Sequence, residues 1–187
     1  APKDAVLGYN SIDRSAGWMS QSLLINSPAD KWEKRVVHYE TPEPQEVSDG
    51  VWLIPGRMLP HRQPDGNSVI LDVPEGLVVI DTGRHAWHRE AILALARTLK
   101  KDVVAVVNTH WHLDHVSGNP ALRAAYPGLR VHASDAIDGA LAGFLRASAS
   151  DSAAYLDDPE IPEEMRDDIR ADLLTIEKGA ALKPDVV

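Results

Sequence analysis

The sequence contains no cysteine among its 187 residues. Disulfide bonds and thiolate metal ligands are therefore excluded, and any metal site in this chain must be built from histidine and carboxylate side chains. The chain also lacks a run of about eighteen apolar residues, the length that a membrane-spanning helix needs. We therefore expect no membrane-spanning segment.

Basic residues are few relative to acidic ones. There are 19 lysines and arginines against 28 aspartates and glutamates, which gives a formal net charge of −9. A charge of this sign repels polyphosphates, so we expect no nucleic-acid partner. The hydrophobic fraction of 44% and the chain length indicate one globular domain with a sizeable core.

The chain begins Ala1-Pro2-Lys3 without a methionine. A mature protein begins in this way after a signal peptide is removed at a small residue, which predicts a periplasmic or secreted protein. The alternative is an artificial chain start in a cytoplasmic protein. Residues 1–46 show no clean periodicity. We interpret them as an N-terminal extension with a short helix in 18–25, a short strand in 36–39 and a proline-restrained linker at 41–44.

Residues 47–187 alternate between strand and helix patterns. Strands are expected at 51–54, 68–73, 77–80, 103–107 and 129–132. Helices are expected at 87–99, 120–126 and 136–145 and from 158 onwards, with a polar break at 148–152. This alternation predicts an α/β fold in which helices flank a mixed sheet.

Three of the eight histidines lie within six positions, directly after the strand expected at 103–107. These histidines are His110, His112 and His115, and Asp114 lies among them. Side chains two apart in an extended segment point the same way, so His110 and His112 can bind one ion, while Asp114 and His115 can face a second position. The alternative is a solvated polar loop, but such a loop gives little reason for a large apolar residue such as Trp111. The pattern favours a metal site.

The segment from Thr109 to His115, followed by Gly118 and Asn119, resembles the H-x-H-x-D-H signature of the metallo-β-lactamase superfamily. Upstream, Leu77 to Gly83 resembles the strand and Asp-Thr-Gly element that precedes the signature in that family. The resemblance implies an αββα sandwich, of which residues 47–187 would be the first half.

The resemblance also implies an activity. Two metal ions, zinc or else iron or manganese, would be held by His110, His112, Asp114 and His115. Asp114 would orient a metal-activated hydroxide that hydrolyses an ester, lactone, thioester, amide or sulfate in a small-molecule substrate. Asp81 is expected to accept a hydrogen bond from a ligand histidine, or alternatively to cap a helix.

A loop at 58–67 corresponds to one that overhangs the metal site in the family. It contains His61 and Arg62, which could bind an anionic group of the substrate, although charged loop tips are often merely solvated.

Members of the family use three further ligands, namely a third histidine, a carboxylate that bridges both metals, and a last histidine. After His115 the sequence offers only His132, which we interpret as a structural residue. We therefore expect a C-terminal fragment of the same domain to be the partner that completes the site. The rival interpretations are a non-catalytic metal-binding or interaction protein that retains the histidine loop, and an iron-containing redox protein.

Overall fold

The structure is a computed structural model that describes residues 42–187. These residues belong to one compact unit that spans 39–187. The helix expected in 18–25 and the strand expected in 36–39 lie outside the described residues. Within 42–187, no helix has both the length and the apolar character that crossing a membrane would require.

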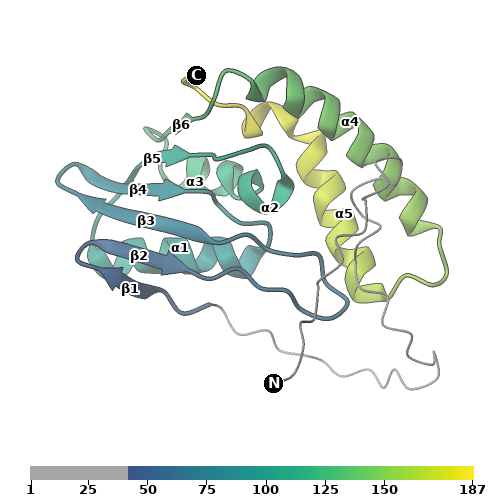
Figure 1. Ribbon diagram of the computed structural model, residues 1–187, viewed down its shortest axis with the longest axis horizontal. Coiled ribbons are helices and arrows are strands. Elements are labelled where there is room, and N and C mark those ends of the chain that lie inside the picture. The colour runs from purple at the N-terminus through teal and green to yellow at the C-terminus, as the bar shows by residue number, and fades with distance from the viewer. Residues whose placement is uncertain (1–41) are drawn as a thin grey trace, which may run out of the picture. The chain divides into compact units, whose positions relative to one another are not determined.

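A single six-stranded sheet, in which the strands follow their order along the chain, forms the centre of this unit (Figure 1). The strands are β1 (Gln45–Ser48), β2 (Val51–Ile54), β3 (Ser68–Val73), β4 (Gly76–Ile80), β5 (Val103–Val107) and β6 (Arg130–His132). Strands β1 to β4 are antiparallel neighbours, whereas β4, β5 and β6 run parallel. The predicted α/β class with a mixed sheet is confirmed, and the sheet begins at Gln45, inside the segment expected to be an extension.

Helices α1 (Ala86–Leu99) and α3 (Asn119–Ala125) cover one face of the sheet (Figure 1). Helix α1 is rich in alanine, which favours helix, and its buried residues include Ile92 and Leu95 on one side. These side chains pack on Ile70 and Val79, both of which are fully buried. The main hydrophobic core therefore lies between the sheet and these two helices.

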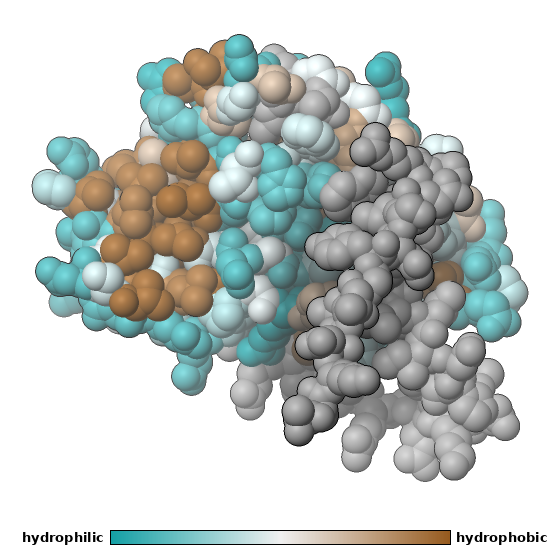
Figure 2. All heavy atoms as spheres, viewed as in Figure 1, coloured by the Kyte–Doolittle hydropathy of each residue, from teal (hydrophilic) through white to brown (hydrophobic). Residues whose placement is uncertain are grey.

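The opposite face of the sheet is apolar but is not buried. Strand register places its side chains in two rows across four strands, and no member of either row is buried. One row is Val51, Leu71, Val78 and Ala105, and the other is Leu53, Val69, Ile80 and Val107. Figure 2 shows hydrophobic side chains gathered over the strands on this face, where Figure 1 shows no helix. Among residues 42–187, no layer buries this face of the sheet, which is therefore available for another layer to cover.

Three further helices form a second, smaller core beside the carboxyl end of the parallel strands. They are α2 (Leu113–Val116), α4 (Ile137–Leu156) and α5 (Glu163–Glu177), and a short 3₁₀ turn, Gly179–Leu182, follows them. Leu113 and Val116 of α2 pack with Leu145 of α4 and with Leu182. This core holds α2, which carries part of the histidine loop, against the later helices.

The prediction of a polar break at 148–152 is wrong, because α4 continues without interruption to Leu156. The segment contains serine, alanine and aspartate but neither glycine nor proline, and so nothing in it stops a helix. Ser152 is even buried, with an exposed fraction of 1% for the whole residue. Polarity alone was a poor indicator of a helix end here.

The two faces of the sheet give a paired stability test on strand β3. We expect Ile70→Ala to lower the free energy of unfolding by about 2–5 kcal/mol, because it leaves a cavity in the packed core. The neighbouring Leu71→Ala, on the uncovered face, should cost less than about 1.5 kcal/mol, since less apolar surface leaves contact. Urea unfolding of both variants measures this, and equal losses would contradict the assignment of the faces.

Candidate metal centre

The histidine loop lies at the carboxyl ends of β4 and β5, which are parallel neighbours, so that the segments leaving them meet. Asp81 follows β4 in the left-handed backbone region with φ of 60°, and Gly83 follows with φ of 69°. At Gly83 a side chain would also collide with the His88 ring, 2.4 Å from the position of a Cβ atom. The Asp-Thr-Gly element is therefore a tight turn for which glycine is needed.

The Asp81 carboxylate connects this turn to the histidine loop. Its Oδ1 accepts a hydrogen bond from the Thr109 backbone N–H at 2.8 Å, and its Oδ2 accepts one from the Thr109 hydroxyl at 2.6 Å. The same Oδ2 accepts a third hydrogen bond from His115 Nδ1 at 2.7 Å. Asp81 is 4% exposed, so these bonds are shielded from water and hold the His115 ring in one orientation.

The four residues predicted to bind metal lie together. His110 Nε2 is 3.2 Å from His112 Nδ1, and His115 Nε2 is 3.3 Å from Asp114 Oδ2. The His110 and His115 rings are 4.0 Å apart between centroids. Within residues 42–187, no set of three or more histidine, aspartate or glutamate side chains is already arranged to hold a metal ion. The structure thus brings the residues together in pairs.

The local environment shifts the pKa values of the four residues in different directions. Burial, and then the neighbouring histidine charges, lower the pKa of both His110 and His112. Burial also acts to lower the pKa of His115, but the carboxylates of Asp114 and Asp81 outweigh it and raise that pKa to about 9. Burial opposes ionisation of Asp114, yet the His115 hydrogen bond and the Arg84 charge leave its pKa lowered. At neutral pH Asp114 is therefore ionised, and the His110 and His112 rings are uncharged, so that each has one unprotonated nitrogen.

An arginine next to the Asp-Thr-Gly turn connects the histidine loop to α5. The Arg84 guanidinium forms an ion pair with Asp172 of α5, and its NH2 group is 3.9 Å from Asp114 Oδ1. Both Arg84 and Asp172 are largely buried. Burial raises the pKa of Asp172 to about 6, although the Arg84 charge opposes this rise. Arg84 thus places a positive charge beside a predicted metal ligand.

A second arginine, in the loop after β2, is also bound by α5. Arg62 donates from Nε to Asp168 Oδ2 at 2.9 Å, and its guanidinium forms a further ion pair with the same carboxylate. His61 lies in the same loop in the left-handed backbone region with φ of 60°. A substrate-binding role for His61 and Arg62 stays a prediction, and Asp168 already compensates part of the Arg62 charge.

Sequence reasoning missed these α5 carboxylates, along with Arg84. Asp168 and Asp172 are four residues apart and border the apolar stripe that includes Ile169, so both lie toward the protein interior. Acidic residues at helical spacing beside a core stripe were the available signal. The sequence alone could not indicate which arginines they would meet.

Comparison with known proteins identifies the family. Residues 62–180, more than half of the chain, match the metallo-beta-lactamase superfamily. The chain therefore belongs to the metallo-beta-lactamase superfamily, as the H-x-H-x-D-H resemblance predicted.

Three curated relatives match shorter parts of the chain. A linear primary-alkylsulfatase from Pseudomonas sp. is 38% identical over 26% of this chain and 10% of its own length. A hydroxyacylglutathione hydrolase from Gloeobacter violaceus is 47% identical over 29% of this chain and 21% of its own. An atrochrysone carboxyl ACP thioesterase from Aspergillus fumigatus is 34% identical over 49% of this chain and 30% of its own.

The chain also resembles solved structures of the same superfamily. One is a metallo-beta-lactamase from Hirschia baltica, with 25% identity and a TM-score of 0.48. The match covers 56% of this chain and 48% of that protein. The chain thus spans about half of the solved relative, and less than a third of each curated relative is matched.

The hydrogen bonds of Asp81 give a direct test of its role. Asparagine tolerates a left-handed backbone, so Asp81→Asn keeps the turn but weakens the acceptor that faces His115. If His115 binds a metal, we expect the zinc affinity to fall by about 10- to 100-fold. Titration with a competing chelator measures this, with Asp185→Asn as the control. Unchanged affinity in Asp81→Asn would remove Asp81 from the site.

A buried histidine near the turn predicts a pH dependence of stability. His88 is fully buried, with Nε2 2.7 Å from the Ser68 hydroxyl, and burial lowers its pKa to about 4. Its pKa in the unfolded chain is about 6.5. Below pH 6.5 the His88 ring of the unfolded chain therefore binds a proton that the folded chain does not, so His88 contributes a loss of stability as the pH falls toward 4.

Replacing this histidine should remove its contribution to the pH dependence of stability. We expect His88→Gln to cost stability at pH 7 but to lose about 2 kcal/mol less than the unsubstituted chain between pH 7 and pH 5. Urea unfolding at both pH values measures the difference. His132→Gln, which replaces a half-buried histidine on β6, is the control variant. Parallel slopes in the unsubstituted chain and His88→Gln would show that His88 titrates normally.

Proposed function

We propose that this chain carries half of the active site of a metal-dependent hydrolase that acts on a small molecule. The observation that supports the proposal most strongly is the chain of contacts from Asp81 through His115 to Asp114, at the meeting point of β4 and β5. A buried carboxylate that fixes the ring of a histidine is the arrangement that orients metal-ligating histidines in proteins. Membership of the superfamily supports the same class of reaction.

The donor set suits zinc. Two nitrogens bound to one tetrahedral zinc at 2.0–2.1 Å are about 3.3 Å apart. The His110–His112 distance of 3.2 Å is close to this spacing, as is the His115–Asp114 distance of 3.3 Å. We propose that His110 and His112 serve one ion, and that Asp114 and His115 face a second, with iron or manganese as alternatives to zinc.

Each residue has a distinct task in this proposal. Bound zinc would supply hydroxide at neutral pH by lowering the pKa of water to about 7, and it would polarise the scissile bond. His110 and His112 present unprotonated nitrogens because their pKa values are lowered. Asp114 keeps its negative charge because Arg84 and His115 stabilise it, and it would orient the nucleophile. Asp81 is a positioning residue that acts through His115.

The remaining ligands would come from a C-terminal part of the same domain. The superfamily resemblance implies three more ligands, and no further histidine, aspartate or glutamate of residues 42–187 completes a metal cluster. The uncovered apolar face of the sheet is a surface on which such a part could pack (Figure 2). We therefore propose that turnover requires the C-terminal part, whereas metal binding begins in this chain.

The chemical class of the substrate is proposed only broadly. By name, the matched relatives are an alkylsulfatase, an acylglutathione hydrolase and an acyl-carrier-protein thioesterase. These activities share attack on an electrophilic centre and release of an alcohol or a thiol. We propose that the substrate is an ester, thioester, lactone, amide or sulfate, and that thioesters are the first compounds to test.

Histidine replacements in the loop test the metal site. We expect the unsubstituted chain to bind zinc, and His110→Ala or His112→Ala to weaken binding by at least about 100-fold, because each removes a ligand. His132→Ala, outside the cluster, is the matched control and should bind normally. Metal content by mass spectrometry and titration measure this. In the protein with its C-terminal part, the same two variants should abolish thioester hydrolysis.

The outcomes separate the proposals. Normal zinc binding by His110→Ala and His112→Ala would refute the ligand assignment. Zinc binding without turnover by the protein that contains the C-terminal part would favour the non-catalytic metal-binding protein instead.

A further inference from the structure

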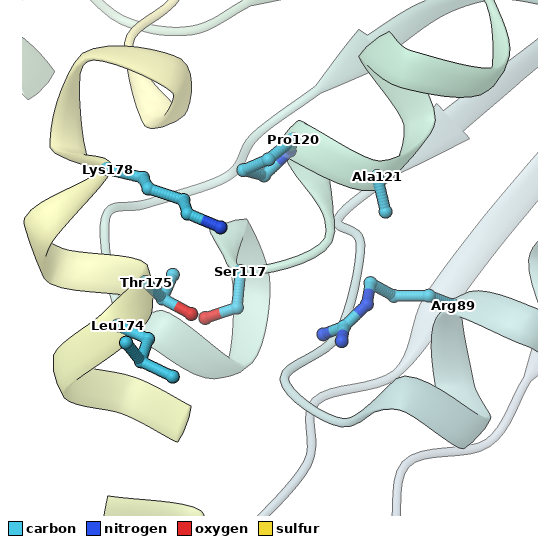
Figure 3. Close-up of a pocket in the computed structure, with 7 residues that line it drawn as sticks. All are labelled: Arg89, Ser117, Pro120, Ala121, Leu174, Thr175 and Lys178. Atoms are coloured by element: carbon cyan, nitrogen blue, oxygen red, sulfur yellow. The ribbon is translucent and has the colours of Figure 1, made fainter. Parts of the chain in front are cut away.

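A cavity of about 310 Å³ lies between α1, the junction of α2 and α3, and α5 (Figure 3). None of the histidines of the metal loop lines it. Its polar side chains are Arg89 from α1, Ser117 from the α2–α3 junction, and Thr175 and Lys178 from α5 and its end. Figure 3 shows the Arg89 guanidinium and the Lys178 amine pointing into the cavity from opposite sides.

Both cations lack an ion pair with a carboxylate of residues 42–187. Arg89 donates from NH1 to the Arg84 backbone carbonyl, and the Asp65 charge acts on it only at a distance. Two positive groups that face one cavity repel each other, and burial further disfavours the charged form of Arg89, whose pKa it lowers. A negatively charged group between them would remove this cost.

A buried hydroxyl also faces the cavity without a partner. Ser117 is 6% exposed, and its Oγ has no hydrogen-bond partner among the described residues. Figure 3 shows this hydroxyl beside that of Thr175, which donates to the Ala171 carbonyl at 2.9 Å. An unused buried donor costs stability unless a bound group accepts from it. Ser117 is therefore the second, independent feature that points to a ligand.

We propose that this cavity binds a small organic oxyanion, a phosphate, sulfate or carboxylate, separately from the metal centre. The charged head lies between Arg89 and Lys178 and accepts a hydrogen bond from Ser117. The carbon part contacts the apolar wall, which is formed by Pro120, Ala121 and Leu174. The cavity volume exceeds what the charged head alone would fill, and Leu174 is 59% exposed and free to cover an apolar group.

This site is connected to the metal loop in two ways. Ser117 is two residues after His115, and the Arg84 residue whose carbonyl Arg89 binds also reaches Asp114. Oxyanion binding would therefore fix α5 against the segment that carries the predicted ligands. The proposal does not depend on hydrolase activity, because it concerns a different set of side chains.

Titration of the metal-free chain with inorganic phosphate, inorganic sulfate and acetate, at constant ionic strength set by sodium chloride, tests the proposal. Backbone NMR should show saturable shifts at Ser117, Thr175 and Lys178 with at least one of the three anions. The anion with the highest affinity identifies the head group. Chloride in place of the oxyanion should give no saturable shift at these residues.

Two variants and one control assign the binding to this cavity. Lys178→Gln should weaken oxyanion binding by about tenfold, because a charge-assisted contact is lost. Ser117→Ala should weaken binding several-fold without lowering the unfolding temperature of the anion-free chain, since the hydroxyl it removes has no partner there. Arg146→Gln, which removes one positive charge on the exposed side of α4, should bind as the unsubstituted chain does.

Several results would overturn the proposal. They are shifts confined to the histidine loop, equal affinity in Lys178→Gln and Arg146→Gln, or no saturable response to any of the three oxyanions at tens of millimolar. A loss of zinc binding with normal phosphate binding would leave the proposal intact, which separates it from the hydrolase assignment.

Discussion

The arrangement of the histidine loop depends on one buried carboxylate. Asp81 stands at the end of β4 with a backbone conformation that most residues avoid, and it accepts three hydrogen bonds from the segment that leaves β5. The strands fix where the two segments start, because β4 and β5 are parallel and adjacent. The carboxylate then fixes how the segments face each other. Without it, Thr109 and His115 would lose the acceptor that they share.

Electrostatics around the loop follow from the same packing. Burial keeps His110 and His112 uncharged, whereas His115 gains a high pKa because two carboxylates flank it. Arg84 contributes a positive charge from the other side, held in place by α5. At neutral pH His110, His112 and Asp114 therefore have the protonation state that borderline metal ions require, whereas His115 would release a proton when it binds a metal.

Much of this could be predicted from the sequence. The alternation of strand and helix patterns predicted the sheet and its flanking helices. The sequence spacing of four residues predicted that they lie together, namely His110, His112, Asp114 and His115. These features are local, since periodicity and the end of a strand determine them. The length of helix α4 was underestimated, because a polar segment was expected to end it. Polar residues without glycine or proline do not end a helix. The pairing of α5 with two arginines could not be predicted, because it joins residues 106 and 88 positions apart in the sequence.

The two arginine–aspartate pairs on α5 have an evolutionary consequence. Each pair removes a cation and an anion from water together, and so the loss of either member leaves a buried charge uncompensated. Positions 62 and 168, and likewise 84 and 172, should therefore change jointly when chains of this superfamily diverge. Homologues without a counterpart of α5 would be expected to carry neutral residues at both arginine positions.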